Sequence, residues 1–186
     1  MKPQIIPFLV AVLFSSCLWA KESPKAFLIF SPFQVGARYM KQMNNDMVWQ
    51  TQPTYSLGGR FQRHTIFLDY NHSEDSSGNQ TLTFKKERTE MMLSYRYAVY
   101  SFNPFLEINL GLGLGFYEDK TRSRLGAQEI SEATGAQPSV LGLTGVGGSW
   151  KYLYYGLEIQ ALSGRDFDPQ PTLGGLFRLG AQFVIF

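Results

Sequence analysis

The sequence is poor in the residue types that build cross-links and metal centres. It contains one cysteine, Cys17, and two histidines, His64 and His72. A single cysteine cannot form an intramolecular disulfide, and a metal site built from histidine and cysteine needs three or four such ligands. We therefore expect neither a disulfide framework nor a metal ion or other cofactor.

Long apolar runs are missing after the first twenty residues. The apolar stretch Ile5–Phe14 is shorter than the roughly 20 residues of a membrane-spanning helix. It has the layout of a secretory signal with cleavage after Ala20. We therefore predict a signal peptide over residues 1–20 and a single domain over 21–186. A weak lipoprotein-type match at Phe14–Cys17 leaves lipidation as an alternative.

Neither sign of charge dominates the chain. Its 17 Lys and Arg against 15 Asp and Glu give a net charge of +2, which argues against nucleic acid as a partner. Aromatic residues and glycine are plentiful instead, at 15% of the chain and 18 residues respectively. That combination suits a β-barrel with aromatic residues at the membrane interfaces and a crowded interior.

Apolar and polar residues alternate with a period of two along most of the chain, as in half-buried strands. The cleanest case is Leu106–Phe116, where large apolar residues alternate with Glu, Asn and Gly. Ser139–Gly148 is the weakest, because both of its faces are small or apolar. Eight such segments are predicted, at residues 33–39, 55–62, 65–70, 90–99, 106–116, 139–148, 153–161 and 177–185.

The connections between these segments alternate strictly between short and long. Short turns are expected at 62–64, 101–104 and 148–151, and long polar loops at 42–53, 72–80, 118–138 and 163–171. Such alternation is typical of an up-and-down barrel with both termini on one side. We therefore predict an all-β fold: an eight-stranded antiparallel up-and-down transmembrane β-barrel with short periplasmic turns and long extracellular loops. Its last strand should pair with the first near Phe33–Tyr39.

The polar face of these segments carries charges of both signs in equal number. They are Arg38, Arg60, Asp69, Glu90, Arg96, Glu107, Glu158 and Arg178. Unpaired charges in a confined space cost several kcal/mol, and the planar fork of arginine suits buried carboxylates. A soluble barrel that turns these charges to water would need no such balance. We therefore expect a charge network in the lumen and the apolar face toward lipid.

Aromatic residues gather beside the short turns and near the C-terminus. We predict a periplasmic girdle, because amphipathic rings favour the headgroup zone. Its members would be Tyr95, Tyr97, Tyr100, Trp150, Tyr152, Tyr155, Phe183 and Phe186. Residues 80–100 and 104–124 far exceed the roughly 9–11 residues that a strand needs to cross a bilayer. Their charged outer halves should stand above the membrane as a polar β extension.

On these features the chain resembles the small eight-stranded outer-membrane barrels of Gram-negative bacteria, the OmpA transmembrane domain, OmpX and opacity-protein type. The resemblance is architectural and covers residues 21–186. It implies an outer-membrane location among lipids and lipopolysaccharide. It also implies that the barrel assembly machinery reads the C-terminal strand through a final aromatic residue, which Phe186 would supply. However, Phe186 shares its parity with Arg178, so either a bulge shifts the register or Phe186 lies beyond the last paired residue.

Little in the sequence points to catalysis. The stretch Gly111–Phe116 looks like a nucleotide loop but lacks the strand–turn–helix setting. His72, Ser73 and Glu74 or Asp75 could form a hydrolytic set, as in lipid A-modifying enzymes of the outer membrane. Residues adjacent in a loop rarely have triad geometry, so a solvated loop is the simpler interpretation.

Transport is also disfavoured, because side chains fill the interior of an eight-stranded barrel. A carrier of hydrophobic molecules would need an apolar lumen pocket, which the polar face does not suggest. We therefore predict a non-enzymatic barrel with a charge-plugged lumen. Its role would be structural, or it would bind an extracellular protein or surface ligand through residues 80–124 and 118–138. A lipid A acyl hydrolase or transferase, and a narrow channel or small-solute transporter, are the alternatives.

Overall fold

The computed structural model describes residues 25–41, 47–78, 82–103, 105–125, 128–165, 167 and 169–185. The predicted signal peptide, its Cys17 and the terminal Phe186 lie outside these residues. Within them, no helix is long and apolar enough to cross a membrane.

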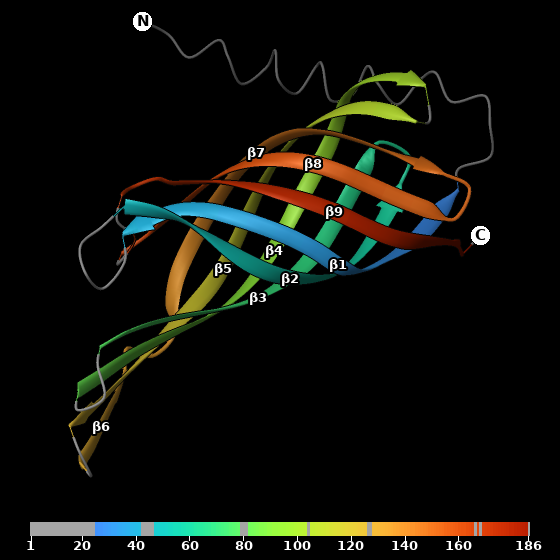
Figure 1. The fold of residues 1–186 in the computed structure, drawn as a ribbon. Coiled ribbons are helices and arrows are strands. Elements are labelled where there is room, and N and C mark those ends of the chain that lie inside the picture. The colour runs from blue at the N-terminus through green and yellow to red at the C-terminus, as the bar shows by residue number, and fades with distance from the viewer. Residues whose placement is uncertain are drawn as a thin grey trace, which may run out of the picture.

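Strands make up nearly all of the described chain. They are β1 (Ala26–Lys41), β2 (Met47–Phe61), β3 (His64–Gly78), β4 (Leu82–Asn103), β5 (Leu106–Leu125), β6 (Gln128–Ala133), β7 (Gln137–Trp150), β8 (Leu153–Gly164) and β9 (Thr172–Val184). All except β6 form a closed antiparallel ring of eight strands, in which β9 pairs with β1 (Figure 1). This confirms the predicted barrel and its closure by the last strand.

Alternate residues of each strand point into the barrel and away from it. In β4, Met92, Ser94 and Arg96 are buried, whereas Met91 and Leu93 are more than half exposed. The same apolar exposure recurs on the outside of the other ring strands, in Leu57, Leu68, Leu112, Leu157 and Phe177 among others. An apolar belt around the outside with polar groups inside is the arrangement of a transmembrane barrel, so the face assignment from the sequence is correct.

Several strands are longer than predicted, and three of the four predicted long loops are largely strand. β2 begins at Met47 rather than Tyr55, and β3 continues to Gly78 in register with β4. Most of 118–138 is the hairpin formed by the end of β5 and by β6. Charged residues occupy both faces there, so the apolar half of the alternation disappears, while backbone pairing and cross-strand ion pairs hold the strands.

The outer parts of four strands continue beyond the ring as one sheet, the lower-left projection in Figure 1. We call it the protruding sheet: residues 72–78 of β3, 82–90 of β4, 117–125 of β5, and β6. It is the polar β extension expected from the sequence. β3 leaves β2 after Asn71, so among the described residues the sheet has two open edges, β3 and β6. The barrel end that carries this sheet is here called the loop end.

The opposite end, the turn end, holds the tight turns at Gln62–Arg63 and Lys151–Tyr152. Closer to the middle of the barrel, the register of β1 shifts against both neighbours between Phe30 and Gln34, so one extra residue lies in β1. β9 itself is regular up to Val184, which pairs with Phe27. Among the described residues the bulge therefore lies in the first strand and not in the last, and the register of Phe186 itself stays a prediction.

Candidate functional site

The inward positions of the strands bring all eight predicted network residues into the lumen. Seven are buried, and Arg60, near the turn end, is half-buried. They come from β1, β2, β3, β4, β5, β8 and β9, so only the closed ring brings them together. The period-two alternation of each strand is what turns them inward.

Four of these residues form a closed cluster in the middle of the barrel. Arg178 binds Asp69 with both terminal nitrogens, at 2.7 and 2.9 Å. Arg96 binds Glu158 through Nε and Nη2, at 2.6 and 3.0 Å. Cross-links at 3.2 Å (Arg178 to Glu158) and 3.7 Å (Arg96 to Asp69) complete the ring. Each charge therefore has two opposite neighbours, which offsets the cost of taking it out of water.

Phe67 lies in the same cluster, a role that sequence reasoning missed. The guanidinium carbons of Arg96 and Arg178 each lie 4.7 Å from the centre of its ring, and the ring is fully buried. Gly58 makes room for it, since a Cβ there would lie 2.4 Å from the Phe67 ring. Two cations over one ring gain cation–π stabilisation. The sequence feature that could have predicted this role is an aromatic residue on the polar face of a strand.

The other four network residues form two pairs on either side of this cluster. Arg38 binds both carboxylate oxygens of Glu90 at 2.6 and 2.5 Å, toward the loop end. Arg60 binds Glu107 at 2.5 Å, toward the turn end. The eight charges thus fill three successive levels of the lumen.

A fifth arginine–carboxylate pair was missed. Arg88 binds Asp119 through two contacts of 2.6 Å, with Lys86 3.0 Å from the same carboxylate. The charged neighbours of Arg88 predict a place in the exposed extension, but Arg88 and Asp119 are each only 3% exposed. Arg88 lies an even number of residues from Glu90 and Arg96 along β4, so it points to the same side of the strand. This spacing could have predicted its burial. Burial acts to raise the pKa of Asp119, but the Arg88 hydrogen bond and charge outweigh it and hold that pKa below the ordinary value.

The loop-end part of the lumen also contains an apolar cluster, whereas a wholly polar interior was expected from the sequence. Met92, Tyr117, Leu141, Leu143, Leu162 and Phe167 form one buried cluster there. Leu141 and Leu143 come from the one predicted strand whose two faces looked alike, and Phe167 comes from a connection. The sequence therefore did not predict that these three residues point into the lumen. Below this cluster, the cavity bordered by Arg38, Glu90 and Gln160 measures only ≈ 10 Å³, about the space of one water molecule.

Seven of the eight predicted girdle residues lie at the turn end of the barrel. Tyr95, Tyr100, Trp150, Tyr152 and Phe183 are exposed, and Tyr97 and Tyr155 are half-buried. Two hydroxyls have partners: Tyr95 pairs with His64 Nδ1 at 2.7 Å, and Tyr155 donates to the Phe105 carbonyl. The eighth, Phe186, lies outside the described residues.

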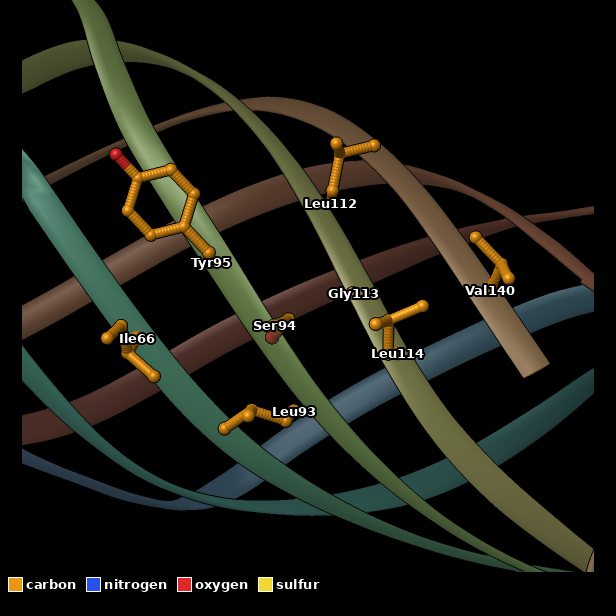
Figure 2. Close-up of a pocket in the computed structure, with 8 residues that line it drawn as sticks. All are labelled: Ile66, Leu93, Ser94, Tyr95, Leu112, Gly113, Leu114 and Val140. Carbon is orange, nitrogen blue, oxygen red and sulfur yellow. The ribbon is translucent and has the colours of Figure 1, made fainter. Parts of the chain in front are cut away.

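A shallow groove on the outside of the ring belongs to the apolar belt, not to the lumen. Its volume is about 380 Å³, and it spans neighbouring strands β3, β4, β5 and β7. Figure 2 shows its side chains, among them Ile66, Leu93, Leu112, Leu114 and Val140, around the bare backbone of Gly113. In a bilayer such a groove faces lipid chains.

The hydrolytic set considered from the sequence is not assembled. His72 and Ser73 are adjacent in β3, so they point to opposite faces of the sheet. Ser73 is buried and lies opposite Arg88, whereas His72 lies 3.3 Å from the Thr89 hydroxyl. Glu74 pairs with Lys85 at 2.9 Å. The described part of the chain also holds no group of three or more His, Cys, Asp and Glu suited to a metal ion.

Comparison with known proteins identifies the fold. Neisserial surface protein A is 16% identical with a TM-score of 0.52, over 89% of this chain and 100% of that one. Ail of Yersinia pestis, solved with the heparin analogue sucrose octasulfate, is 12% identical (TM-score 0.53; 87% and 99% covered). The N-terminal β-barrel domain of Pseudomonas aeruginosa OprF is 9% identical (TM-score 0.50; 85% and 97% covered).

All three structures are small eight-stranded bacterial outer-membrane barrels, the fold and location predicted from the sequence. No family model matches the chain, and no curated protein matches it. The likeness therefore lies in the architecture.

The Arg60–Glu107 pair gives a first test of the network. Glu107→Ala removes the carboxylate that neutralises a mostly buried arginine, so we expect the barrel to lose about 3 kcal/mol of unfolding free energy. Urea unfolding of the protein in phospholipid vesicles measures this loss. Glu118→Ala is the control, because that side chain is 40% exposed and 3.8 Å from Lys120; it should cost less than about 1 kcal/mol. Equal losses would show that the lumen pair is not required.

The Arg88–Asp119 pair predicts a pH dependence. Because the pKa of Asp119 is depressed in the folded state, its stabilisation is complete above the pKa of the unfolded chain and is lost as the pH falls through the folded value. The difference in unfolding free energy between wild type and Asp119→Asn should therefore be constant near neutral pH and shrink in acid. Carbon-13 NMR should place the Asp119 carboxyl midpoint below 3.8; a higher midpoint, or a difference independent of pH, contradicts the pairing.

Proposed function

We propose that this protein is a non-enzymatic outer-membrane barrel whose filled lumen passes no solute and whose protruding sheet binds a protein at the cell surface. The observation that carries the proposal is an exposed apolar patch beside an open strand edge on that sheet. The barrel would serve as its anchor.

The outer surface of the barrel indicates its membrane partners. The apolar belt would contact lipid chains, and the charged outer face of the protruding sheet, directly above the belt, would meet lipopolysaccharide headgroups. The closing strand β9 (Thr172–Val184) and the aromatic residue at 186 would be read by the assembly machinery. We also propose that the signal peptide over residues 1–20 directs export.

The apolar patch lies on the lumen-side face of the protruding sheet. Leu125 and Ile130 are 61% and 65% exposed. Phe84, Ser123 and Ile130 are paired across β4, β5 and β6, and Leu82 pairs with Leu125 in the next row. We call Leu82, Phe84, Leu125 and Ile130 the tip patch. Exposed apolar surface with a polar surround marks an interaction site, since covering it gains roughly 25 cal/mol per Å².

The open edge beside the patch suits an extended partner. β6 pairs only with β5 among the described residues, so the backbone groups on its other side can receive an added strand. Such edges carry charges that suppress indiscriminate association, and β6 has Glu129 and Glu132. A partner strand with basic residues between apolar ones would meet both the edge and the tip patch.

An anionic polysaccharide fits this sheet less well, although Ail was solved with a heparin analogue. Lys85 lies 2.9 Å from both Glu74 and Glu87. Lys120 and Arg122 each lie 3.8 Å from a glutamate. Cations that already face carboxylates leave little net attraction for a polyanion. The exposed tip patch therefore favours a protein partner.

Selection of short phage-displayed peptides on the purified barrel in nanodiscs tests this proposal. Enriched peptides should alternate apolar and basic residues. The double variant Leu125→Ser/Ile130→Ser should bind these peptides at least about tenfold more weakly than wild type, a loss of about 1.4 kcal/mol of binding free energy. Thr83→Ala/Ser131→Ala, on the opposite face of β4 and β6, is the matched control and should leave binding unchanged.

Equal affinity of the enriched peptides for wild type and for the double variant would contradict the tip patch as a binding site. The enzymatic alternative has its own readout, the mass profile of lipid A from cells with and without the protein. An altered acylation pattern would contradict a non-enzymatic role.

A further inference from the structure

At the loop end of the lumen, a space the size of one aromatic ring is filled by a side chain of the protein itself. Phe167 is only 4% exposed although it lies in the connection between β8 and β9. Its ring joins Met92, Tyr117, Leu141, Leu143 and Leu162, all of which stand on barrel strands. The strands thus form the walls of a slot, and Phe167 occupies it. Tyr117 and Arg88 lie at the base of the protruding sheet, but no residue of the tip patch lines the slot, so the slot is independent of the proposed protein-binding role.

The slot has the geometry of an aromatic binding site. The Phe167 ring meets Tyr117 edge-on, with centres 4.9 Å apart. The Arg88 guanidinium carbon lies 4.5 Å from the centre of the Phe167 ring and 4.9 Å from that of Tyr117. Gly164 keeps the slot open, since a Cβ there would lie 2.6 Å from the Phe167 ring and 2.9 Å from that of Tyr117. Edge-on and cation–π contacts both favour a flat aromatic group.

Two buried polar atoms beside the slot have no hydrogen-bond partner among the described residues: Arg88 Nη1 and Ser139 Oγ. Both residues are only 3% exposed. Arg88 lies against the Phe167 ring, and Ser139 pairs in register with Gly164. Leaving a buried donor without a partner is unfavourable, so native proteins usually give such groups a partner. Both atoms can donate to an oxygen, a contact that the Phe167 side chain cannot supply.

We propose that this slot binds a small aromatic acid and that Phe167 is its internal competitor. The ligand ring would take the place of the Phe167 ring between Arg88 and Tyr117. Its carboxylate would accept hydrogen bonds from Arg88 Nη1 and Ser139 Oγ. Asp119 keeps the Arg88 fork oriented through Nε and Nη2, which leaves Nη1 for the ligand. A receptor for such acids needs an apolar site in the lumen, and the barrel has one; binding there requires no passage of solute through the lumen.

Fluorine-19 NMR of 4-fluorobenzoate with the full chain in detergent micelles tests the proposal. Wild type should broaden the signal with weak affinity, because part of the binding free energy is spent in displacing Phe167. Phe167→Ala removes the competitor and should bind at least about tenfold more tightly. Adding Ser139→Ala to that variant should weaken binding again, and 4-fluorotoluene, which lacks the carboxylate, should bind less tightly than 4-fluorobenzoate.

Two further variants separate binding in the slot from binding elsewhere on the barrel. Gly164→Ala places a methyl group in the slot and should abolish binding, whereas Phe183→Ala, an exposed aromatic on the lipid side, should behave as wild type. Resistance to SDS until boiling verifies that each barrel is folded. If Phe167→Ala does not fold, binding by wild type and its loss in Gly164→Ala still decide the matter. No binding by a folded Phe167→Ala, or equal binding by wild type, Gly164→Ala and Phe183→Ala, would overturn the proposal.

Discussion

The pairing of buried arginines with buried carboxylates governs how this barrel can be built. An eight-stranded ring is so narrow that side chains must fill it. Because the outside of the ring is an apolar belt, the polar side chains of the strands must point into the lumen. Each ion moved there alone would cost several kcal/mol. The ring formed by Arg96, Arg178, Asp69 and Glu158 gives every charge two opposite neighbours within 3.7 Å. Because its members come from β3, β4, β8 and β9, the network can form only when the barrel has closed.

The two ends of the barrel differ because the filling of the lumen changes along its axis. Ion pairs fill the turn end and the middle, whereas at the loop end the pairs Arg38–Glu90 and Arg88–Asp119 lie beside an apolar cluster with an aromatic slot. Beyond that cluster the strands of one side continue into the protruding sheet, held by backbone pairing and surface ion pairs. A closed, rigid base and an exposed sheet with an open edge suit an anchor that presents a binding surface.

Period-two alternation was sufficient to predict the ring, its closure and the inward charges, because lipid and lumen impose opposite polarities on the two faces of a strand. It could not show where strands end once the alternation becomes irregular, as in residues 47–53, or both faces become polar, as in residues 72–78, so both segments looked like loops. It could not pair Arg60 with Glu107 or place Phe67 between two arginines, since those contacts cross the ring. The charged neighbours of Arg88 suggested exposure, although its parity pointed inward. The burial of Phe167 could not be predicted, because no pattern in the neighbouring sequence shows that a residue of a connection points into the lumen.

Paired charges and packed side chains should together close the lumen to ions. The sharpest test is the current across a planar lipid bilayer into which the purified wild-type barrel has been inserted, with insertion verified by recovery of the protein in floated vesicles of the same lipid. We expect a current no greater than that of the bare bilayer. A steady, ohmic conductance step with each inserted barrel would contradict a closed lumen.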